Sequence, residues 1–214
     1  MKTYVITIAD NEFSKSAADR CVASAKNFGI ECEYFEAITP KHDPEAIAKK
    51  KNIPTHAFNN VYSRYLNCLS AFLSHYSLWE RSFKTSSEIL ILEHDAVFVD
   101  KIPDVSFDRL MSIGKPSYGK FNTGKFLGVN PLFSKPYLPG AHAYIIKPSG
   151  AAELIIKSKS DSGPTDVFLN LNNFPWLQEY YPWPVEVRDG FTTIQKEQGC
   201  IAKHTYDKEK YFIV

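Results

Sequence analysis

An uninterrupted apolar run that ends in acidic residues, ILILEHDAVF at 89–98, constrains the fold of this chain more than any other stretch. Its first four residues are branched aliphatics, without the alternation of apolar and polar residues that a half-exposed strand shows. Such a run is typical of a central parallel strand that is covered on both faces. The expected architecture is therefore a mostly parallel sheet flanked by helices, with Glu93, His94 and Asp95 at the end of a central strand.

The N-terminal segment predicts a strand, a helix and a second strand. Residues 3–9, TYVITIA, form the first apolar run. An amphipathic helix with Ser14 or Ser16 as its N-cap is expected next, and Gly29 is placed to end it. Residues 30–38 alternate in polarity and predict the second strand. A strand–helix–strand opening favours a parallel sheet.

The strongest helical pattern covers 61–83, with an apolar stripe that includes Leu66, Leu73 and Phe83 and leaves Ser70 and Ser74 outside it. The other expected elements are a short helix starting at Asp43 and Pro44, a short helix at 106–113, a strand at 141–147 with a helix after it, a helix near Thr165 or Asp166, and a strand at 185–187. The segment between Gly114 and Gly140 is rich in glycine, proline and aromatic residues. A loop of this length is usually functional, so a lid or an acceptor wall is expected there.

Length and composition exclude several classes of protein. A chain of 214 residues suits one domain spanning 1–214, and a formal net charge of +1 provides no basic field for nucleic acid. The four cysteines lack C-x-x-C spacing, which argues against a cysteine zinc site. The N-terminal apolar run is too short for a signal peptide, and no stretch approaches the roughly 20 apolar residues of a transmembrane segment. A soluble, cytoplasmic protein is expected.

The acidic tip of the 89–98 run has the chemistry of a metal and phosphate site. Ligands of open α/β sheets bind at the carboxyl ends of the strands. In an extended chain Glu93 and Asp95 point the same way, whereas His94 points elsewhere. Hard oxygen ligands at this spacing suit Mg²⁺ or Mn²⁺, whose remaining positions phosphate oxygens often fill. The pattern alone leaves a second interpretation open, in which the acids begin a solvated loop.

Four segments in one order carry a family resemblance. They are LSHYSLWERS at 73–82, ILILEHDAVF at 89–98, GAHAYIIKPSGAAELI at 140–155 and PTDVFLN at 164–170. In this order they resemble glycosyltransferase family 25, which includes bacterial lipooligosaccharide galactosyltransferases and collagen galactosyltransferases. The resemblance covers roughly residues 3–198, and four motifs in register are more specific than any one of them.

The resemblance implies a GT-A type α/β fold and an inverting transfer of a hexose, galactose or glucose. The donor would be a UDP-sugar, the acceptor a glycan or another hydroxyl compound, and the cofactor Mn²⁺ or Mg²⁺. Asp95 would bind the metal directly, and Glu93 would reach the ribose or, through water, the metal. His94 stands where the family usually has a second Asp. The alternative is a degenerate module that binds a nucleotide sugar without turnover.

Two residues have both a catalytic and a structural interpretation. Asp166 matches the Pro-x-Asp of the family and is the candidate base that takes the proton of the acceptor hydroxyl. It is equally expected as a helix N-cap. His75 matches the Ser-His of the family and would orient Glu93 near the donor. Otherwise it is a half-buried histidine at the edge of an apolar stripe.

The remaining candidates are more weakly indicated. His142 would face the acceptor or lie on a strand surface, and His204 would be a further metal ligand or a solvated tail residue. Asp10 ends the first strand, where GT-A folds receive the base and ribose of the donor. Arg20 would meet the donor phosphates or base, or be a cation on a helix surface.

Overall fold

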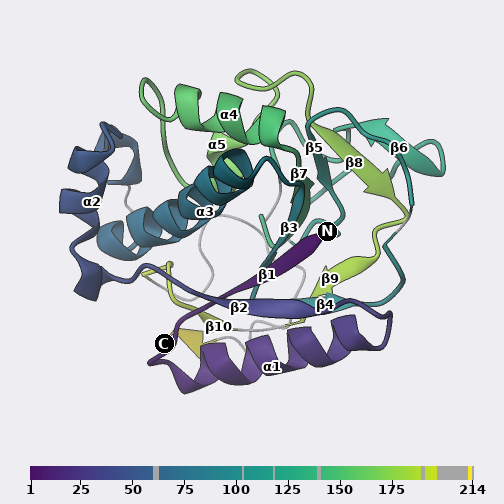
Figure 1. The fold of residues 1–214 in the computed structure, drawn as a ribbon, viewed down its shortest axis with the longest axis horizontal. Coiled ribbons are helices and arrows are strands. Elements are labelled where there is room, and N and C mark those ends of the chain that lie inside the picture. The colour runs from purple at the N-terminus through teal and green to yellow at the C-terminus, as the bar shows by residue number, and fades with distance from the viewer. Residues whose placement is uncertain are drawn as a thin grey trace.

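The computed structural model describes residues 1–59, 63–102, 104–117, 119–138, 141–188 and 191–196, together with the backbone of 212–213 (Figure 1). Its centre is a seven-stranded sheet in the order β2-β1-β3-β7-β5-β8-β6. The strands are β1 Lys2–Thr7, β2 Cys32–Glu36, β3 Ile89–Glu93, β5 Leu110–Ser112, β6 Gly128–Pro131, β7 Ala143–Ile146 and β8 Gln178–Tyr181. Only β7 and β6 run against their neighbours, so the other five strands share one direction. The expectation of a mostly parallel sheet is confirmed.

Helices cover both faces of this sheet (Figure 1). They are α1 Glu12–Lys26, α2 Pro44–Lys50, α3 Tyr65–Thr85, α4 Pro148–Lys157 and α5 Thr165–Phe168, with 3-10 turns at Pro40–His42 and His56–Phe58. α1 packs on one face, and α3, α4 and α5 pack on the other. Two small sheets complete the fold, one of β4 Ala96–Phe98 with β9 Val185–Val187 and one of β10 Phe191–Thr192 with β11 Phe212–Ile213. Within the described ranges, no helix combines the length and apolarity needed to cross a bilayer.

The β3 strand confirms the prediction made from its apolar run. Ile89 and Ile91 pack into the core under α3 and α4, whereas Leu90 and Leu92 pack into the core under α1. All four side chains are at most 1% exposed, because β3 lies between β1 and β7 and has a helical layer on each side. Burying a side chain of this size stabilises a fold by about 1.5–3 kcal/mol. The strand is therefore a rigid base for the acidic residues at its end.

Three expectations about the elements are wrong in ways that have physical causes. Residues 106–113 contain β5 instead of a helix, because the backbone around Leu110 and Met111 pairs with β7 and β8 and both side chains are buried. A short apolar run in the sequence does not distinguish a strand from a helix. The segment after Gly114 contains the edge strand β6 and is not loop throughout. Asn11, and neither Ser14 nor Ser16, caps α1, since its side chain accepts a hydrogen bond from the backbone N–H of Ser14.

The buried face of α3 also differs from the expected stripe. Leu66 and Phe83 are exposed, at 37% and 53%, whereas Ser70 and Ser74 are buried. The Ser74 hydroxyl donates to the Ser70 carbonyl and accepts from the backbone N–H of Ile38, both at 2.9 Å. The side of α3 that faces the end of β2 therefore carries small polar side chains. A search for apolar residues at helical spacing does not predict that this side is buried.

Candidate functional site

A cavity of about 150 Å³ lies where the carboxyl ends of β1, β2 and β3 meet the first half of α3. Its walls combine the ends of these strands, one side of the helix, the acidic tip and a C-terminal segment. The lining residues are Ile6, Ile8, Ala37, Ile38, Thr39, Pro40, Asn67, Ser70, Ala71, Ser74, His75, Glu93, His94, Asp95, Phe191, Thr192, Thr193 and Ile194. Both acidic residues of the tip therefore line one cavity at the ligand-binding edge of the sheet.

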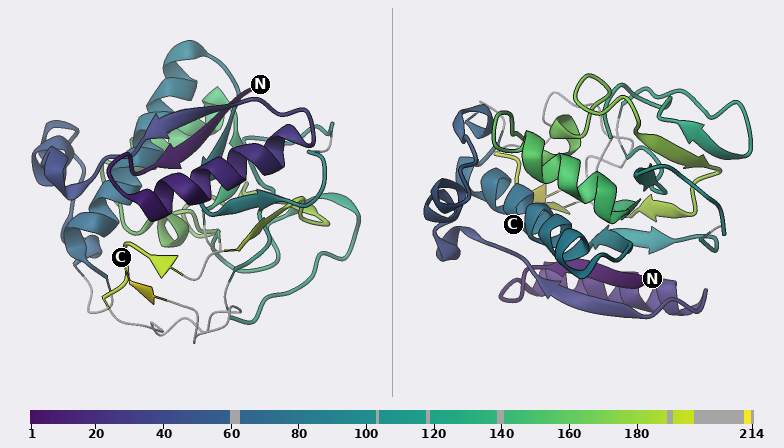
Figure 2. Two further views of the ribbon diagram at one scale, coloured as in Figure 1. Left: turned by 90° about the horizontal axis from the view of Figure 1, so that it is seen from below. Right: turned by 45° about the horizontal axis from the view of Figure 1, so that its top comes forward.

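The roof of the cavity is the segment Phe191–Ile194, which lies close to the start of α3 (Figure 2). The Asn67 side-chain amide donates to the Thr193 carbonyl at 2.7 Å, and the Arg64 backbone N–H donates to the Ile194 carbonyl at 2.7 Å. These bonds hold the C-terminal part of the chain over the cavity. No sequence pattern predicted this roof, because its position depends on contact with α3, which lies more than a hundred residues earlier in the chain.

His94 lines the same cavity, so the expectation that it points elsewhere is only partly right. β3 ends at Glu93, and His94 and Asp95 form a turn, so the alternation of a strand does not continue through the tip. The His94 ring stacks on Phe191, with centroids 5.3 Å apart and planes at 15°. Its Nδ1 lies 3.0 Å from the Ser14 hydroxyl, which itself accepts from the Ile8 backbone N–H. His94 thus joins the acidic tip to α1 and to the roof.

A buried chain of hydrogen bonds supports Glu93 from behind. Trp79 Nε1 donates to the Tyr144 hydroxyl at 2.8 Å, and that hydroxyl lies 2.9 Å from His75 Nδ1. His75 Nε2 lies 3.0 Å from Glu93 Oε1. His75 and Trp79 are four residues apart and so share one side of α3, while Tyr144 stands on β7 beside β3. The helix motif and the strand motif of the family resemblance therefore converge on one carboxylate.

The order of this chain favours one tautomer of a neutral His75. Trp79 can only donate, so it occupies a lone pair of the Tyr144 oxygen. Burial raises the pKa of Tyr144 well above its usual value, so the phenol keeps its proton. That proton has His75 Nδ1 as its acceptor, which leaves the imidazole proton on Nε2, where it donates to Glu93. His75 is thus a fully buried orienting residue and not a half-buried one at a stripe edge.

The surroundings of Glu93 favour its charged form. Burial raises the pKa of this carboxyl, but the hydrogen bond from His75 and the nearby rings of His75, His142 and His94 outweigh burial and lower it. The side chain is 32% exposed, toward the cavity. A carboxylate held in place and negatively charged at neutral pH is suited to a cation or to a ribose hydroxyl.

His142 lies directly before β7 and is 1% exposed, so it is not a strand-surface residue. Its backbone carbonyl accepts from the Glu93 N–H at 2.9 Å, which ties the start of β7 to the acidic tip. Its ring rests on Gly114, where a Cβ atom would stand 2.3 Å from His142 Nε2. Glycine at 114 therefore provides the space that this imidazole fills.

Replacing Gly114 with alanine is expected to destabilise the fold by about 1–3 kcal/mol, because the added methyl group overlaps the buried ring of His142, which must shift to make space. Thermal denaturation measures this as a lower melting temperature. Gly163→Ala is the matched control, since its added Cβ would meet nothing closer than 3.8 Å. Equal melting temperatures for the two variants would contradict the close contact of Gly114 with His142.

Asp166 is the second residue of α5, and it is not the helix cap, which is Pro164. Its Oδ1 accepts from the Val167 backbone N–H at 2.9 Å. Burial raises the pKa of the Cys68 thiol to about 12, and the nearby charge of Asp166 acts in the same direction. Asp166 therefore lies near the start of α3, although it does not line the cavity.

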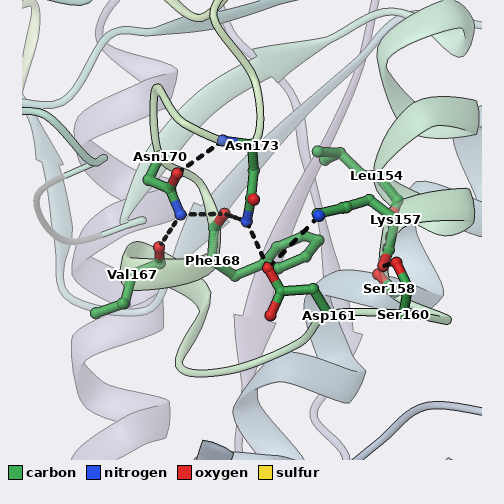
Figure 3. Close-up of polar contacts among 9 residues, drawn as sticks. All are labelled: Leu154, Lys157, Ser158, Ser160, Asp161, Val167, Phe168, Asn170 and Asn173. Carbon is green, nitrogen blue, oxygen red and sulfur yellow. Dashed lines mark hydrogen bonds and ion pairs between the residues drawn. The ribbon is translucent and has the colours of Figure 1, made fainter.

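The segment that follows α5 is fixed by a compact set of side-chain amides (Figure 3). The Asn170 amide donates to the Val167 and Phe168 carbonyls at 2.8 and 3.2 Å, and its oxygen accepts from the Asn173 backbone N–H. Asn173 in turn donates to Asp161 at 2.8 Å, beside the end of α4. These contacts close off the carbonyls at the end of the short helix and so define where Asp166 stands.

Two further sequence candidates, Asp10 and Arg20, are not brought to the cavity. Asp10 is exposed and pairs with Lys41, whose ammonium lowers the pKa of the Asp10 carboxyl. Arg20 is exposed on α1, and neither residue lines the cavity. His204 lies outside the described residues. Among the residues that are described, no group of three or more His, Cys, Asp and Glu side chains is placed to hold a metal ion, so Glu93 and Asp95 are a two-carboxylate set.

Comparison with known proteins gives a family and a distant structural likeness. The family model described as glycosyltransferase family 25 (LPS biosynthesis protein) matches residues 1–112. No curated protein matches the chain at a significant level. Among solved structures, CTP:phosphocholine cytidylyltransferase from Streptococcus pneumoniae aligns at 9% identity and a TM-score of 0.38, over 86% of this chain and 91% of that one.

Proposed function

The chain belongs to glycosyltransferase family 25, and on this basis we propose that it transfers galactose or glucose from a UDP-sugar to a glycan or another hydroxyl acceptor, with inversion. One observation supports this most directly. Glu93 and Asp95 stand on the wall of a cavity that the carboxyl ends of three parallel strands form. This edge is where open α/β sheets bind nucleotides.

The cavity suits the nucleoside part of such a donor. Its volume of about 150 Å³ is below the roughly 300–1,000 Å³ of sites that enclose a whole ligand, so one part of a nucleotide sugar fills it. Ile8, Ala37 and Ala71 offer apolar contacts to a planar base. Ser70 is 2% exposed and lines the cavity, and its hydroxyl has no hydrogen-bond partner in the described part of the chain. It is a candidate contact for a polar edge of the nucleoside.

The two carboxylates fit a divalent ion that shares its shell with phosphate. Mn²⁺ and Mg²⁺ accept few protein ligands when a diphosphate supplies the other oxygens. Asp95 is the proposed direct ligand, and Glu93, held by His75, is the proposed partner through water or the ribose. An ion bound there would neutralise charge on the leaving diphosphate.

Asp166 is the proposed general base. In a direct displacement the acceptor oxygen bonds to the anomeric carbon while the bond from that carbon to the phosphate oxygen breaks. The hydroxyl proton then passes to a carboxylate within hydrogen-bond reach. The amide contacts of Asn170 and Asn173 hold α5 in one place, which is what a positioned base requires.

A cytoplasmic location remains a prediction.

Binding of a UDP-sugar with Mn²⁺ is expected to raise the melting temperature. At a ligand concentration of about one hundred times Kd the added stability is about 2.7 kcal/mol, or roughly 5–10 °C for a chain of this size. A thermal-shift panel of UDP-, GDP- and CDP-sugars, each with Mn²⁺ or with a chelator, measures this. Release of UDP is then followed in the samples that show a shift.

The outcomes separate the proposed enzyme from its alternative. A shift that depends on Mn²⁺ and is followed by UDP release supports sugar transfer. A shift without any release, under every acceptor tried, supports the degenerate nucleotide-sugar-binding module instead. If no nucleotide sugar changes the melting temperature, the cavity does not bind a donor of this class.

A further inference from the structure

We propose that a second cavity, beside α5, binds an anionic saccharide and serves as the acceptor site of the proposed transfer. This cavity, termed the lysine groove, has a volume of about 670 Å³ and is lined by parts of 120–122 and 132–137 together with Leu171. Its size lies within the roughly 300–1,000 Å³ of small-ligand sites. The identification of the bound saccharide as the acceptor rests on the proposed function, but the binding itself does not.

The lining of the lysine groove indicates the class of ligand. Phe121, Phe133 and Tyr137 present aromatic surface, on which the apolar face of a pyranose ring packs. Lys120 and Lys135 supply positive charge, and none of the described residues that line the groove is acidic. A neutral sugar uses only the aromatic surface, whereas a sugar that carries a carboxylate or phosphate uses both.

Ser134 is a candidate for a specific polar contact with the ligand. Ser134 is 2% exposed and lines the groove, and within the described part of the chain its hydroxyl has no hydrogen-bond partner. A buried hydroxyl without a partner costs roughly 1–3 kcal/mol, which a ligand oxygen or hydroxyl in the groove would offset. This observation points to a ligand that can make hydrogen bonds, as saccharides do.

A buried glutamate holds this wall in place before any ligand binds. Glu179 on β8 is 1% exposed, and its Oε1 accepts from the backbone N–H groups of Phe133 and Ser134, both at 2.7 Å. Its Oε2 accepts from Trp183 Nε1 at 3.3 Å. Glu179 does not line the groove, so its carboxyl group holds the wall from behind and does not face the ligand. A wall fixed in this way reduces the ordering cost of binding.

The lysine groove adjoins the proposed base. Its wall pairs with the chain that leaves α5, because the Leu138 N–H donates to the Leu169 carbonyl at 2.7 Å and the Leu171 N–H donates to the Pro136 carbonyl at 2.9 Å. Burial lowers the pKa of Lys135, while the charge of Asp166 acts in the opposite direction. Asp166 is thus near both this groove and the start of α3, which places a saccharide bound in the groove close to the residue that would accept its proton.

A matched pair of monosaccharides tests the proposal. Methyl β-D-glucuronide and methyl β-D-glucoside differ only at C6, which is a carboxylate in the first and a hydroxymethyl group in the second. Saturation-transfer NMR at low ionic strength compares their affinities for the whole chain. The expected result is at least severalfold tighter binding of the glucuronide. The preference is expected to disappear in the variant Lys120→Ala/Lys135→Ala and to persist in Lys49→Ala/Lys50→Ala, which removes the same charge from the exposed face of α2. The affinities of glucose 6-phosphate and glucose, compared in the same way, show whether a phosphate group is preferred as a carboxylate is.

Equal affinity for glucuronide and glucoside would overturn the proposal, as would a preference that survives loss of both lysines in a variant that melts like the wild type. If the double variant does not fold, two single variants replace it. Lys135→Arg keeps the charge and is expected to keep the preference for the glucuronide, whereas Lys120→Ala removes a charge and is expected to reduce that preference. The UDP-sugar thermal shift of the wild-type chain is recorded in parallel. Its absence, with glucuronide still bound, would reject the proposed function and leave the lysine groove standing.

Discussion

Replacing Asp95 with asparagine is expected to lower Mn²⁺-dependent release of UDP from a UDP-sugar by at least about a hundredfold. Loss of a residue that only supports a metal ligand costs roughly 10–100-fold, and loss of the proposed direct ligand is expected to cost at least the upper end of this range. Asp95 and Glu93 are the two carboxylates on the cavity wall. With one charge removed, Glu93 alone remains to hold a divalent ion against the hydration shell that such an ion otherwise keeps. The assay is a time course of UDP release at several Mn²⁺ concentrations.

The fold of the Asp95→Asn variant is expected to stay intact, because asparagine matches aspartate in size and the tip stands outside the strand ladder. Circular dichroism and the melting temperature check this. Asp104→Asn is the matched control, since Asp104 is exposed and does not line the cavity. Unchanged turnover in Asp95→Asn, with turnover in the control also unchanged, would remove Asp95 from the metal site.

Replacing Tyr144 with phenylalanine is expected to destabilise the fold by about 1–3 kcal/mol, because the loss of one hydroxyl leaves Trp79 Nε1 and His75 Nδ1 buried without their partner. The melting temperature should fall by several degrees. Release of UDP should also fall by about tenfold, since His75 is then no longer restricted to the tautomer that donates to Glu93. Long-range ¹H–¹⁵N NMR reports the tautomer of His75 directly.

The control for this prediction is Tyr34→Phe. The Tyr34 hydroxyl bonds to Asp19 on the surface, so its removal should change the stability by less than about 0.5 kcal/mol. In the wild type the NMR spectrum should show a protonated Nε2 and an unprotonated Nδ1. A wild-type spectrum with the proton on Nδ1 would contradict the order of donors derived for Trp79, Tyr144 and His75.

The central strand was predictable because its signal is local. The bounds of β3 agree with the apolar run, since a strand buried on both faces needs uninterrupted aliphatic residues and little else. The β7 strand and α4 followed from the same kind of pattern. β5 did not, because three residues that pair with distant strands carry no period of their own.

The candidate site was predictable at its acidic tip and at His75, and not elsewhere. Glu93 and Asp95 follow from the rule for strand ends, and His75 follows from the family resemblance. The parallel strands also bring Ala37 and Thr39 to the same edge, which the strand–helix–strand pattern implied without naming them. The partners of His75 are beyond any local pattern, since Tyr144 lies 69 residues away in sequence.

The roof of the cavity and its acidic tip come from different parts of the chain. The floor and the acids lie within residues 1–112, the part that matches the family, whereas Phe191–Ile194 lie outside it. Substitutions of Thr192, Thr193 and Ile194 therefore change the shape of the cavity without replacing a carboxylate, whereas Phe191 also stacks on His94 of the acidic tip. If the proposed donor binds in this cavity, its fit therefore depends partly on a segment other than the one that carries the two carboxylates.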